Sequence, residues 1–423
     1  MQKNNNYWTY LIDNFERDLA GITWWINETN FHKGNKVCLL PTKELSAKYL
    51  FNERPDVIVW NYARNNNIEF IKIANYLNIF NIIHDTEGIP YNMSNYFNIN
   101  QKGFEYIDEI WCWGKIQKET LEKKIYKLKI KPKILAMGSI RYEYIKSLKK
   151  NDFTKNINKV LWNTNYPLLS PRYQTVFREY KELYKLNKYY TEEESFYLFL
   201  KLASRRQKAY EFIKRIFTDQ KKINLTIRPH PFESSKFYRE SLLYKYKKVK
   251  ISEGCDVNDD LENTSLVIQN GCQTVLDSFI RGTPSIRTST EEINIWSKLT
   301  PYIESRKLEA NINNINFLNR IYSKQKKLFK INKVNLLLNN LSNKIKISNS
   351  PKIRESKFQL GFNKIVFLIY IRLKILAKEI LIKDSIDSKK KKKINTLDIV
   401  NFIKKKYKLN TLSRKNFCLI YPK

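Results

Sequence analysis

The first third of the chain alternates between short apolar runs and longer segments whose apolar residues recur at helical spacing. The short runs are almost continuously apolar and are bounded by polar or turn residues, which is typical of buried strands. The segments between them, such as Leu19–Asn30 and Glu69–Leu77, have the spacing of helices. Strands that alternate with helices indicate parallel βαβ units. The predicted strands are Asn35–Leu40, Asp56–Trp60, Ile79–His84, Tyr106–Trp113 and Lys133–Gly138.

The same alternation starts again near residue 158. A long helical region over Tyr173–Asp219 follows the first strand, and a shorter helix is predicted over Thr274–Ile280. The fold class is therefore α/β, with two Rossmann-like doubly wound domains, 1–150 and 151–330, joined by a linker at 151–158. The predicted strands of the second domain are Lys159–Asn163, Asn224–Arg228, Lys248–Ser252, Leu266–Gln269 and Ser285–Arg287.

The remaining residues, 331–423, are predicted to form a basic helical C-terminal extension. Residues 361–382 are strongly apolar, with basic side chains at Lys364, Arg372, Lys374 and Lys378, and the run Lys389–Lys393 follows. A basic amphipathic helix of this kind can lie on an anionic membrane surface. It can equally pack back on a domain and leave its charged face in water. The most apolar part, Ile365–Ile371, is flanked by Lys364 and Arg372 and is well below the roughly 20 residues that a membrane span needs.

The main feature of the composition is a large positive charge. The 423 residues carry a net charge of +36, and 42% of them are hydrophobic, enough for large cores. The charge indicates either a polyanionic partner or surfaces filled with Lys and Asn. A nucleic-acid partner is not expected, because the basic residues are spread along the chain without a recognition module.

The cysteines and the polar N-terminus indicate a compartment. The five cysteines are scattered without a CxxC pair, and the first residues are polar. We therefore expect a cytoplasmic protein, with a peripheral position on the inner face of the cytoplasmic membrane as a refinement.

The first candidate for chemistry is the loop from His84 to Gly88, which follows a buried strand. Ligands bind at the carboxyl ends of strands in open parallel sheets. His84, Asp85 and Glu87 are the predicted catalytic residues, since a carboxylate or an imidazole can accept the proton of an attacking hydroxyl. The alternative is that Asp85 or Thr86 only caps the next helix.

A second polar loop, Arg228–Glu233, follows a strand of the second domain. Arg228 and His230 are predicted to bind a leaving phosphate, whose developing charge needs cations or donors, with Glu233 in the same loop. His230 could instead be a structural histidine.

A third polar turn lies between a strand and the helix at Thr274. Backbone N–H groups at a helix start bind phosphate oxygens, and Asp277 lies one turn further on, where it could reach ribose hydroxyls. Many such turns are structurally similar without binding anything. The predicted phosphate-binding residues are Asn270, Gly271, Cys272, Gln273 and Thr274.

A fourth candidate, Arg141, follows the last strand of the first domain and either faces a cleft or forms a hinge ion pair. No metal is expected, because no DxD-type carboxylate pair follows a strand. Asp259 and Asp260 precede a predicted helix and look like its cap.

Taken together, these motifs resemble the bacterial surface carbohydrate biosynthesis proteins, a group with a GT-B-like architecture. The match runs in order from about residue 12 to 290. Asp277 stands where such families more often have Glu, and Ser139 where Asn is commoner. The matching motifs are Asp13-Asn14, Arg17-Asp18-Leu19, His84–Gly88, Trp113-Gly114, Gly138–Arg141, Asn163-Thr164-Asn165, Arg228–Pro231, Gln269–Thr274 and Gly282–Pro284.

The resemblance implies a glycosyltransferase that moves a sugar from a nucleotide-sugar donor to a growing surface glycan or a lipid-linked acceptor. The donor would be UDP-, GDP- or CMP-linked, and no further cofactor is required. Arg141, Asn163 and Asn165 would face the cleft between the domains. Two alternatives stay open: a nucleotide-sugar epimerase of the same architecture, and a non-catalytic scaffold of polysaccharide assembly.

Overall fold

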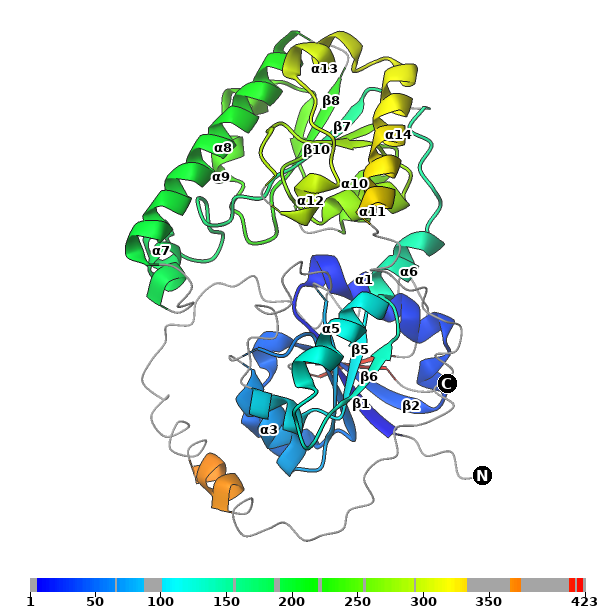
Figure 1. Cartoon of the computed structure of the whole chain (residues 1–423), viewed down its shortest axis with the longest axis vertical. Helices are drawn as coiled ribbons and strands as arrows, with labels where there is room; N and C mark the ends of the chain where they lie inside the picture. The colour runs from blue at the N-terminus through cyan, green and yellow to red at the C-terminus, as the bar shows by residue number, and fades with distance from the viewer. Residues whose placement is uncertain are drawn as a thin grey trace. The chain divides into compact units, whose positions relative to one another are not determined.

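The computed structural model of the chain forms two compact units, each built around its own sheet (Figure 1). Unit 1 contains the residues up to Tyr144 and the described parts of the chain after 334, and unit 2 contains Ile145–Val334. The structure describes residues 6–64, 67–86, 101–154, 157–185, 191–219, 223–253, 256–292, 294–332, 366–373, 411–414 and 417–420.

The sheet of unit 1 has eight strands in the order β12-β13-β2-β1-β3-β4-β5-β6. Strands β1 to β6 are parallel. The first strand was not predicted from the sequence, because its apolar residues follow an asparagine run and lack a turn signal. Its bounds and those of its parallel neighbours are β1 Asn6–Ile12, β2 Asn35–Pro41, β3 Val57–Trp60, β4 Phe80–His84, β5 Glu109–Cys112 and β6 Lys133–Ala136.

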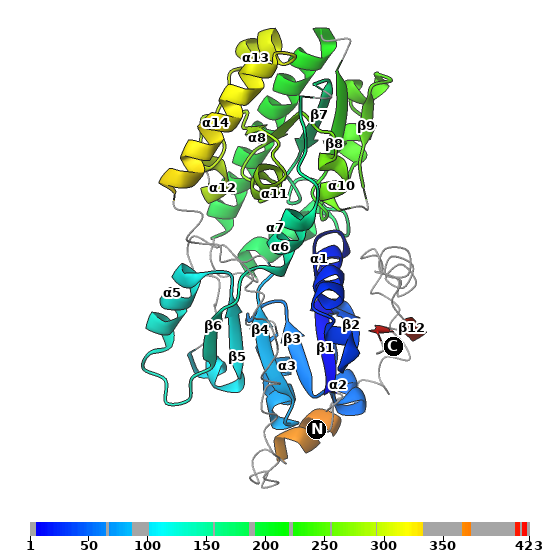
Figure 2. The same cartoon turned by 90° about the vertical axis from the view of Figure 1, so that its right-hand side faces the viewer.

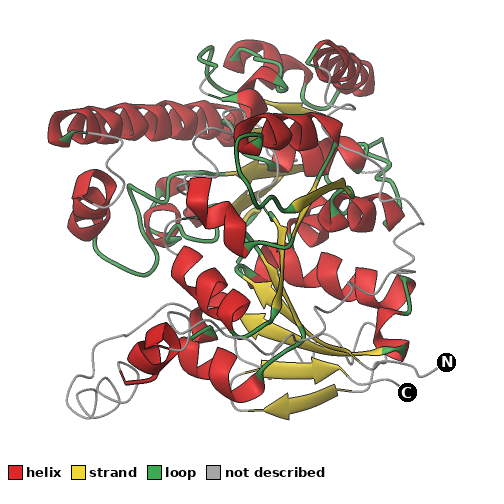
Figure 3. Ribbon diagram, turned by 60° about the horizontal axis from the view of Figure 1, so that its bottom comes forward, coloured by secondary structure: helices red, strands yellow, loops and turns green. Residues whose placement is uncertain are grey.

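Alternate residues of these strands enter two different hydrophobic cores, one on each face of the sheet. Leu11 and Trp60 belong to the core that also holds residues of α2, α3 and α5. Tyr10 and Val59, their chain neighbours, belong to the core formed with α1 and α6. Helices thus cover the parallel strands, as a doubly wound fold requires (Figure 3). The helices are α1 Phe15–Glu28, α2 Ala47–Glu53, α3 Ile68–Tyr76, α5 Lys115–Ile125 and α6 Ile140–Ser147, with 3-10 turns at Phe31–Lys33, Thr42–Glu44 and Gln101–Tyr106.

The sheet of unit 2 has five parallel strands in the order β11-β10-β7-β8-β9. Its main core lies against the long helix α8 and the helices α13 and α14, and a smaller cluster lies against α10. The strands are β7 Lys159–Asn163, β8 Asn224–Arg228, β9 Val249–Ile251, β10 Leu266–Gln269 and β11 Ser285–Ile286. The helices are α7 Val176–Lys185, α8 Glu192–Asp219, α9 Lys236–Arg239, α10 Val257–Leu261, α11 Thr274–Ile280, α12 Ile295–Lys298, α13 Ser305–Asn311 and α14 Ile315–Ile331, with a 3-10 turn at Leu242–Lys245.

The described parts of the predicted helical extension include both a helix and a hairpin. Residues 366–373 are helical (Figure 2, orange). Strands β12 (Thr411–Arg414) and β13 (Phe417–Ile420) pair antiparallel with each other, and β13 pairs antiparallel with β2. The prediction of a purely helical extension is corrected here, because this short hairpin finds its partner at the otherwise open edge of β2.

Candidate functional site

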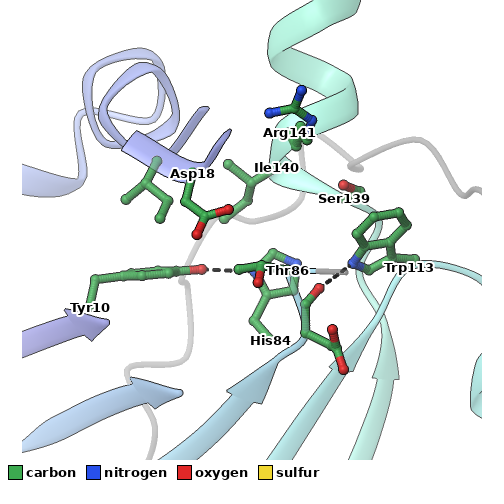
Figure 4. A pocket seen from close by; sticks show the side chains of 10 residues that line it. Tyr10, Asp18, His84, Thr86, Trp113, Ser139, Ile140 and Arg141 are labelled. Atoms are coloured by element: carbon green, nitrogen blue, oxygen red, sulfur yellow. Dashed lines mark hydrogen bonds between the residues drawn. The ribbon is translucent and has the colours of Figure 1, made fainter. Parts of the chain in front are cut away.

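A small cavity of unit 1 lies at the carboxyl ends of β4, β5 and β6, where ligands bind in open parallel sheets (Figure 4). Its volume is about 30 Å³, room for little more than a water molecule. The predicted loop after β4 supplies three of its residues, and Arg141 lies at the start of α6. The lining residues are Tyr10, Asp18, Ile22, His84, Asp85, Thr86, Trp113, Ser139, Ile140 and Arg141.

His84, the last residue of β4, is held by hydrogen bonds at both ring nitrogens. Nδ1 lies 2.8 Å from the Tyr10 hydroxyl, and Nε2 lies 3.3 Å from the Gly138 carbonyl oxygen. A carbonyl can only accept, so Nε2 carries the hydrogen and Nδ1 accepts from Tyr10. Burial lowers the pKa of His84 to about 4, which keeps the ring neutral near pH 7. Both nitrogens are thus engaged within the protein, an arrangement that suits a positioning residue better than a base.

Two carboxylates face the same cavity from different elements. Asp18, near the start of α1, accepts from the Arg17 Nε at 2.7 Å and from the Asn14 backbone N–H at 3.0 Å. Arg17 also donates to the Thr86 hydroxyl at 3.0 Å, which ties α1 to the loop after β4. Asp85 is 2% exposed. Glu87 lies outside the described residues.

A tight contact between α1 and α6 lies beside the cavity. A Cβ atom on Gly21 would lie 3.2 Å from the Cα of Arg141, so a larger residue would push the helices apart. Arg141 donates from Nη1 to the carbonyl of Arg17. On the opposite side the Trp113 indole donates to the Asp85 carbonyl at 2.7 Å. Arg141 therefore lines this cavity of unit 1, while its two predicted roles, facing a cleft between the domains or forming a hinge ion pair, stay predictions.

In the sheet of unit 2, strands β8 and β9 are added on one side of β7, whereas β10 and β11 are added on its other side. The order in which strands are added therefore reverses between β7 and β10. This is the topological switch point, the place where nucleotides bind in open α/β sheets. Asn163, the last residue of β7, is in register with Gln269 of β10 and with Arg228 of β8. The predicted phosphate-binding loops thus begin at neighbouring strand ends. Asn163 is buried and Asn165 half-buried.

Arg228, predicted to bind phosphate, is engaged in a buried ion pair. Its Nη1 lies 2.6 Å from the Asp260 carboxylate, and both side chains are under 10% exposed. The Ser252 hydroxyl donates to the same oxygen at 2.6 Å. The prediction that Asp260 caps a helix is corrected, because the cap of α10 is Asp256, which accepts from the Asn258 N–H at 3.0 Å.

Glu233 joins the loops after β7 and β8. Its buried carboxylate accepts from the hydroxyls of Tyr238 at 2.6 Å and Thr164 at 2.8 Å, and from the Tyr166 N–H at 3.0 Å. Burial raises the pKa of Glu233, and these donors oppose that shift. His230 is half-buried, and its Nδ1 accepts from the Phe232 N–H at 3.3 Å. Glu233 therefore fixes the conformation of the loop that carries His230.

The turn from β10 into α11 depends on Gly271, whose φ of +77° is in the left-handed region that favours glycine. Its carbonyl accepts from the Asn294 side chain at 2.9 Å. The Cys272 N–H donates to the Gln269 side chain at 2.6 Å, and Asn270 accepts from the Thr288 N–H at 3.0 Å.

Two of the predicted residues follow this turn. Gln273 is the N-cap residue of α11, and Thr274 is its first residue. Asp277 is 2% exposed on the same helix, so its side chain lies mostly inside unit 2.

Several residues of these sites were not among the predicted site residues. Tyr10 lies on the strand that was not predicted, 74 positions before its partner His84. Thr164 and Tyr166 act through Glu233, 69 and 67 positions away. The spacing of residues along the chain does not reveal such pairs, although Arg17-Asp18 and Thr164 belong to the motifs of the resemblance.

Metal-binding clusters and membrane-spanning helices are both absent from the described residues. No group of three or more His, Cys, Asp or Glu side chains there could hold a metal ion. In the same part of the chain, no helix has both the length and the apolar character that crossing a membrane requires.

Several solved structures are similar to this chain. The UDP-GlcNAc 2-epimerase from Neisseria meningitidis, bound to UDP-GlcNAc, matches 78% of this chain and 99% of its own, at 10% identity and a TM-score of 0.49. The enzyme of that name from Methanocaldococcus jannaschii, in complex with UDP-GlcNAc and UDP, matches 77% and 99%, at 13% identity and 0.46. The spinosyn rhamnosyltransferase SpnG matches 78% and 96%, at 9% identity and 0.38. No family model and no curated protein matches the sequence.

The structure confirms the predicted fold class, because it has two α/β units, each with parallel strands arranged as in Rossmann-like domains. The prediction of a glycosyltransferase is corrected, because several of the similar structures are named as UDP-GlcNAc 2-epimerases. Their names agree with the alternative predicted from the sequence, a nucleotide-sugar epimerase.

Proposed function

We propose that this chain is an enzyme that binds a nucleotide sugar and changes the configuration of the sugar while it stays attached to the nucleotide. The observation that carries the proposal is the set of polar strand ends at the topological switch point of unit 2. Nucleotides bind outside this point in open parallel sheets. The left-handed Gly271 leads directly into a helix start, where backbone N–H groups favour phosphate oxygens.

The predicted residues of unit 2 divide into two roles. Arg228 and Glu233 are proposed as positioning residues, since Asp260 and Tyr238 already engage them. Asp277 joins this group because it is almost completely buried. The groups proposed to contact the nucleotide are the turn Asn270–Thr274 and the side chains of Asn163, Asn165 and His230.

Unit 1 is proposed to supply acid–base chemistry. Inverting a carbon centre requires removal of a proton from one face and its return on the other, which positioned carboxyl groups can perform. Asp85 and Glu87 are the proposed acid–base groups, with Arg141 nearby as a cation. The neutral His84 is proposed to position the loop through its bonds to Tyr10 and Gly138.

A binding and product experiment tests the proposal. We expect one of a set of UDP-, GDP- and CMP-sugars to raise the melting temperature, because a ligand that binds only the native state stabilises it. UDP-GlcNAc is the first to test, since it is named in structures of similar fold. Proton and phosphorus NMR should then show a new sugar configuration with the sugar still on its nucleotide. Binding without conversion would indicate a scaffold, and no binding would overturn the proposal.

Two glycines give a matched pair for the nucleotide site. Gly271→Ala and Gly282→Ala both force a side chain into a left-handed backbone, at φ of +77° and +83°. Gly271 lies before the start of α11 and Gly282 just after its end. Both variants should lose similar stability, about 1–2 kcal/mol. Only Gly271→Ala should also weaken nucleotide-sugar binding.

The catalytic assignment has its own test in unit 1. Asp85→Asn should lower the rate of conversion by about 10²–10⁴-fold while nucleotide-sugar binding is kept. Glu119→Gln, on the exposed surface of α5, is the control and should keep the full rate. Full conversion by Asp85→Asn would leave Glu87 as the base to test next.

A further inference from the structure

The helix at residues 366–373 is attached to unit 1 through one of its faces. Phe367 and Ile371, one turn apart, pack against the core that includes residues of α3. The Phe367 ring meets that of Tyr76 edge to face, with centroids 5.3 Å apart. The Lys72 ammonium lies 4.5 Å from the centre of the Phe367 ring. These contacts fix the helix beside α3, as the orange helix in Figures 1 and 2 shows.

The other face of this helix is apolar and exposed. Val366, Ile369, Tyr370 and Leu373 have the i, i+3, i+4, i+7 spacing that places side chains on one stripe. They are 48%, 54%, 56% and 60% exposed, respectively. Single exposed apolar residues are normal, but a continuous stripe of large ones marks an interaction surface. Phe367 and Ile371 dock the helix on unit 1, while the side chains of this stripe stay largely exposed.

The charge around the stripe identifies the kind of partner. Arg372 lies on the same helix and is exposed. In the sequence Lys364 and Lys374 flank the helix closely, and Lys378 and Lys389–Lys393 follow. No acidic residue occurs between positions 361 and 378. An apolar stripe edged by cations complements a surface that combines hydrocarbon with negative charge, which is the interface of an anionic bilayer.

We propose that this stripe, Val366, Ile369, Tyr370 and Leu373, docks the protein on an anionic membrane surface. The described residues of this helix, 366–373, span about 12 Å at 1.5 Å per residue. Because its apolar stripe lies on one face, the helix is expected to lie in the plane of the interface, with the stripe among the upper acyl chains and Arg372 among the headgroups. The proposal is independent of the reaction that the protein performs.

The test uses the full chain and vesicles of two compositions, phosphatidylcholine alone and phosphatidylcholine with about 30% phosphatidylglycerol, an anionic lipid. Co-sedimentation should be strong with the anionic vesicles at low salt and should weaken in about 0.5 M salt, where charges are screened. The double variant Ile369→Asn/Leu373→Asn should bind the anionic vesicles at least about tenfold more weakly. Its melting temperature should be unchanged, because both side chains face solvent.

A matched control removes apolar side chains of similar exposure from unit 2. Phe177 and Tyr197 are 64% and 66% exposed, and Phe177→Asn/Tyr197→Asn should bind vesicles as the wild type does. Equal binding by the Ile369/Leu373 variant and the wild type would overturn the proposal, as would equal binding to neutral vesicles. If light scattering showed that this variant breaks a dimer while vesicle binding stays intact, the stripe would be covered by a second copy and the proposal would be wrong.

Discussion

The two units place different polar chemistry at the carboxyl ends of their sheets. In unit 1 the strand-end residue His84 is neutral, and it lies between the Tyr10 hydroxyl and the Gly138 carbonyl beside a small cavity. In unit 2 the strand-end residue Arg228 is charged and is paired with Asp260. A charged pair tolerates the loss of a partner poorly, whereas a neutral buried imidazole tolerates a proton poorly. The carboxyl end of the unit 1 sheet should therefore be sensitive to acid, and that of the unit 2 sheet to the loss of a charged side chain.

The largest effect is expected in unit 2 from Asp260→Ala. It leaves the Arg228 guanidinium buried without this carboxylate, and the free energy of unfolding should fall by about 3–5 kcal/mol. Urea unfolding of the variant and the wild type measures the difference. Glu240→Ala is the control, because its pair with Lys236 is exposed and should be worth about 1 kcal/mol or less. A loss for Asp260→Ala as small as that of the control would contradict the contrast.

Acid should act mainly through unit 1. The pKa of His84 is lowered from 6.5 to about 4 in the folded state, so the unfolded state binds the proton more readily. Stability is fully present above pH 6.5 and is lost as the pH falls through 4, by about 3 kcal/mol from this group. Urea unfolding across this range should show less acid sensitivity in His84→Gln. Equal acid sensitivity of His84→Gln and the wild type would contradict this assignment.

Substituting one tyrosine in each unit compares the hydrogen bonds at the carboxyl ends of the two sheets. Tyr238→Phe removes a donor to the Glu233 carboxyl, and Tyr10→Phe removes a donor to the neutral His84. Bonds to charged groups are worth more, so we expect losses of about 1.5–3 and 0.5–1.5 kcal/mol at about pH 8. Chemical unfolding measures both. Equal losses would contradict the expected difference between a bond to a carboxylate and a bond to a neutral ring.

The smallest changes in stability are expected from replacing one glycine in each unit by alanine. Gly282 has a φ of +83°, and an added Cβ would lie 3.3 Å from the Asn151 carbonyl oxygen. Gly34 has a φ of −126° and open space around an added Cβ. Gly282→Ala should destabilise by about 1 kcal/mol or more, and Gly34→Ala should change stability by less than about 0.5 kcal/mol. Thermal unfolding of both variants would show whether backbone conformation or lost flexibility dominates.

Much of the fold was predictable, since the signals are local. The apolar runs that became β2 to β6 and β7 to β11 are visible in the sequence, and so is the position of His84 and Arg228 at strand ends. Strand β1 was not predicted because no turn residue bounds its apolar segment, and an apolar segment alone does not indicate a strand. The hairpin β12–β13 was missed because its partner β2 lies at the other end of the chain.

The loops that carry the candidate sites were predictable, but the hydrogen bonds and ion pairs between their residues were not. Which charge Arg228 meets depends on Asp260, 32 positions later, and nothing in the spacing connects the two. Asp260 was interpreted as a cap from its local sequence, a role that belongs to Asp256. Local patterns thus locate polar residues, while long-range contacts decide whether those residues are engaged or available.

The pairing of β13 with β2 has a consequence for the synthesis of the protein on the ribosome. Cys418 lies opposite Leu39, so the edge of β2 emerges long before the strand that covers it. At ordinary rates of translation this interval lasts roughly 20–80 s. An unpaired strand edge is a template for contact with other chains. We therefore expect nascent chains that stop before residue 411 to recruit chaperones or aggregate more readily than chains that contain β13.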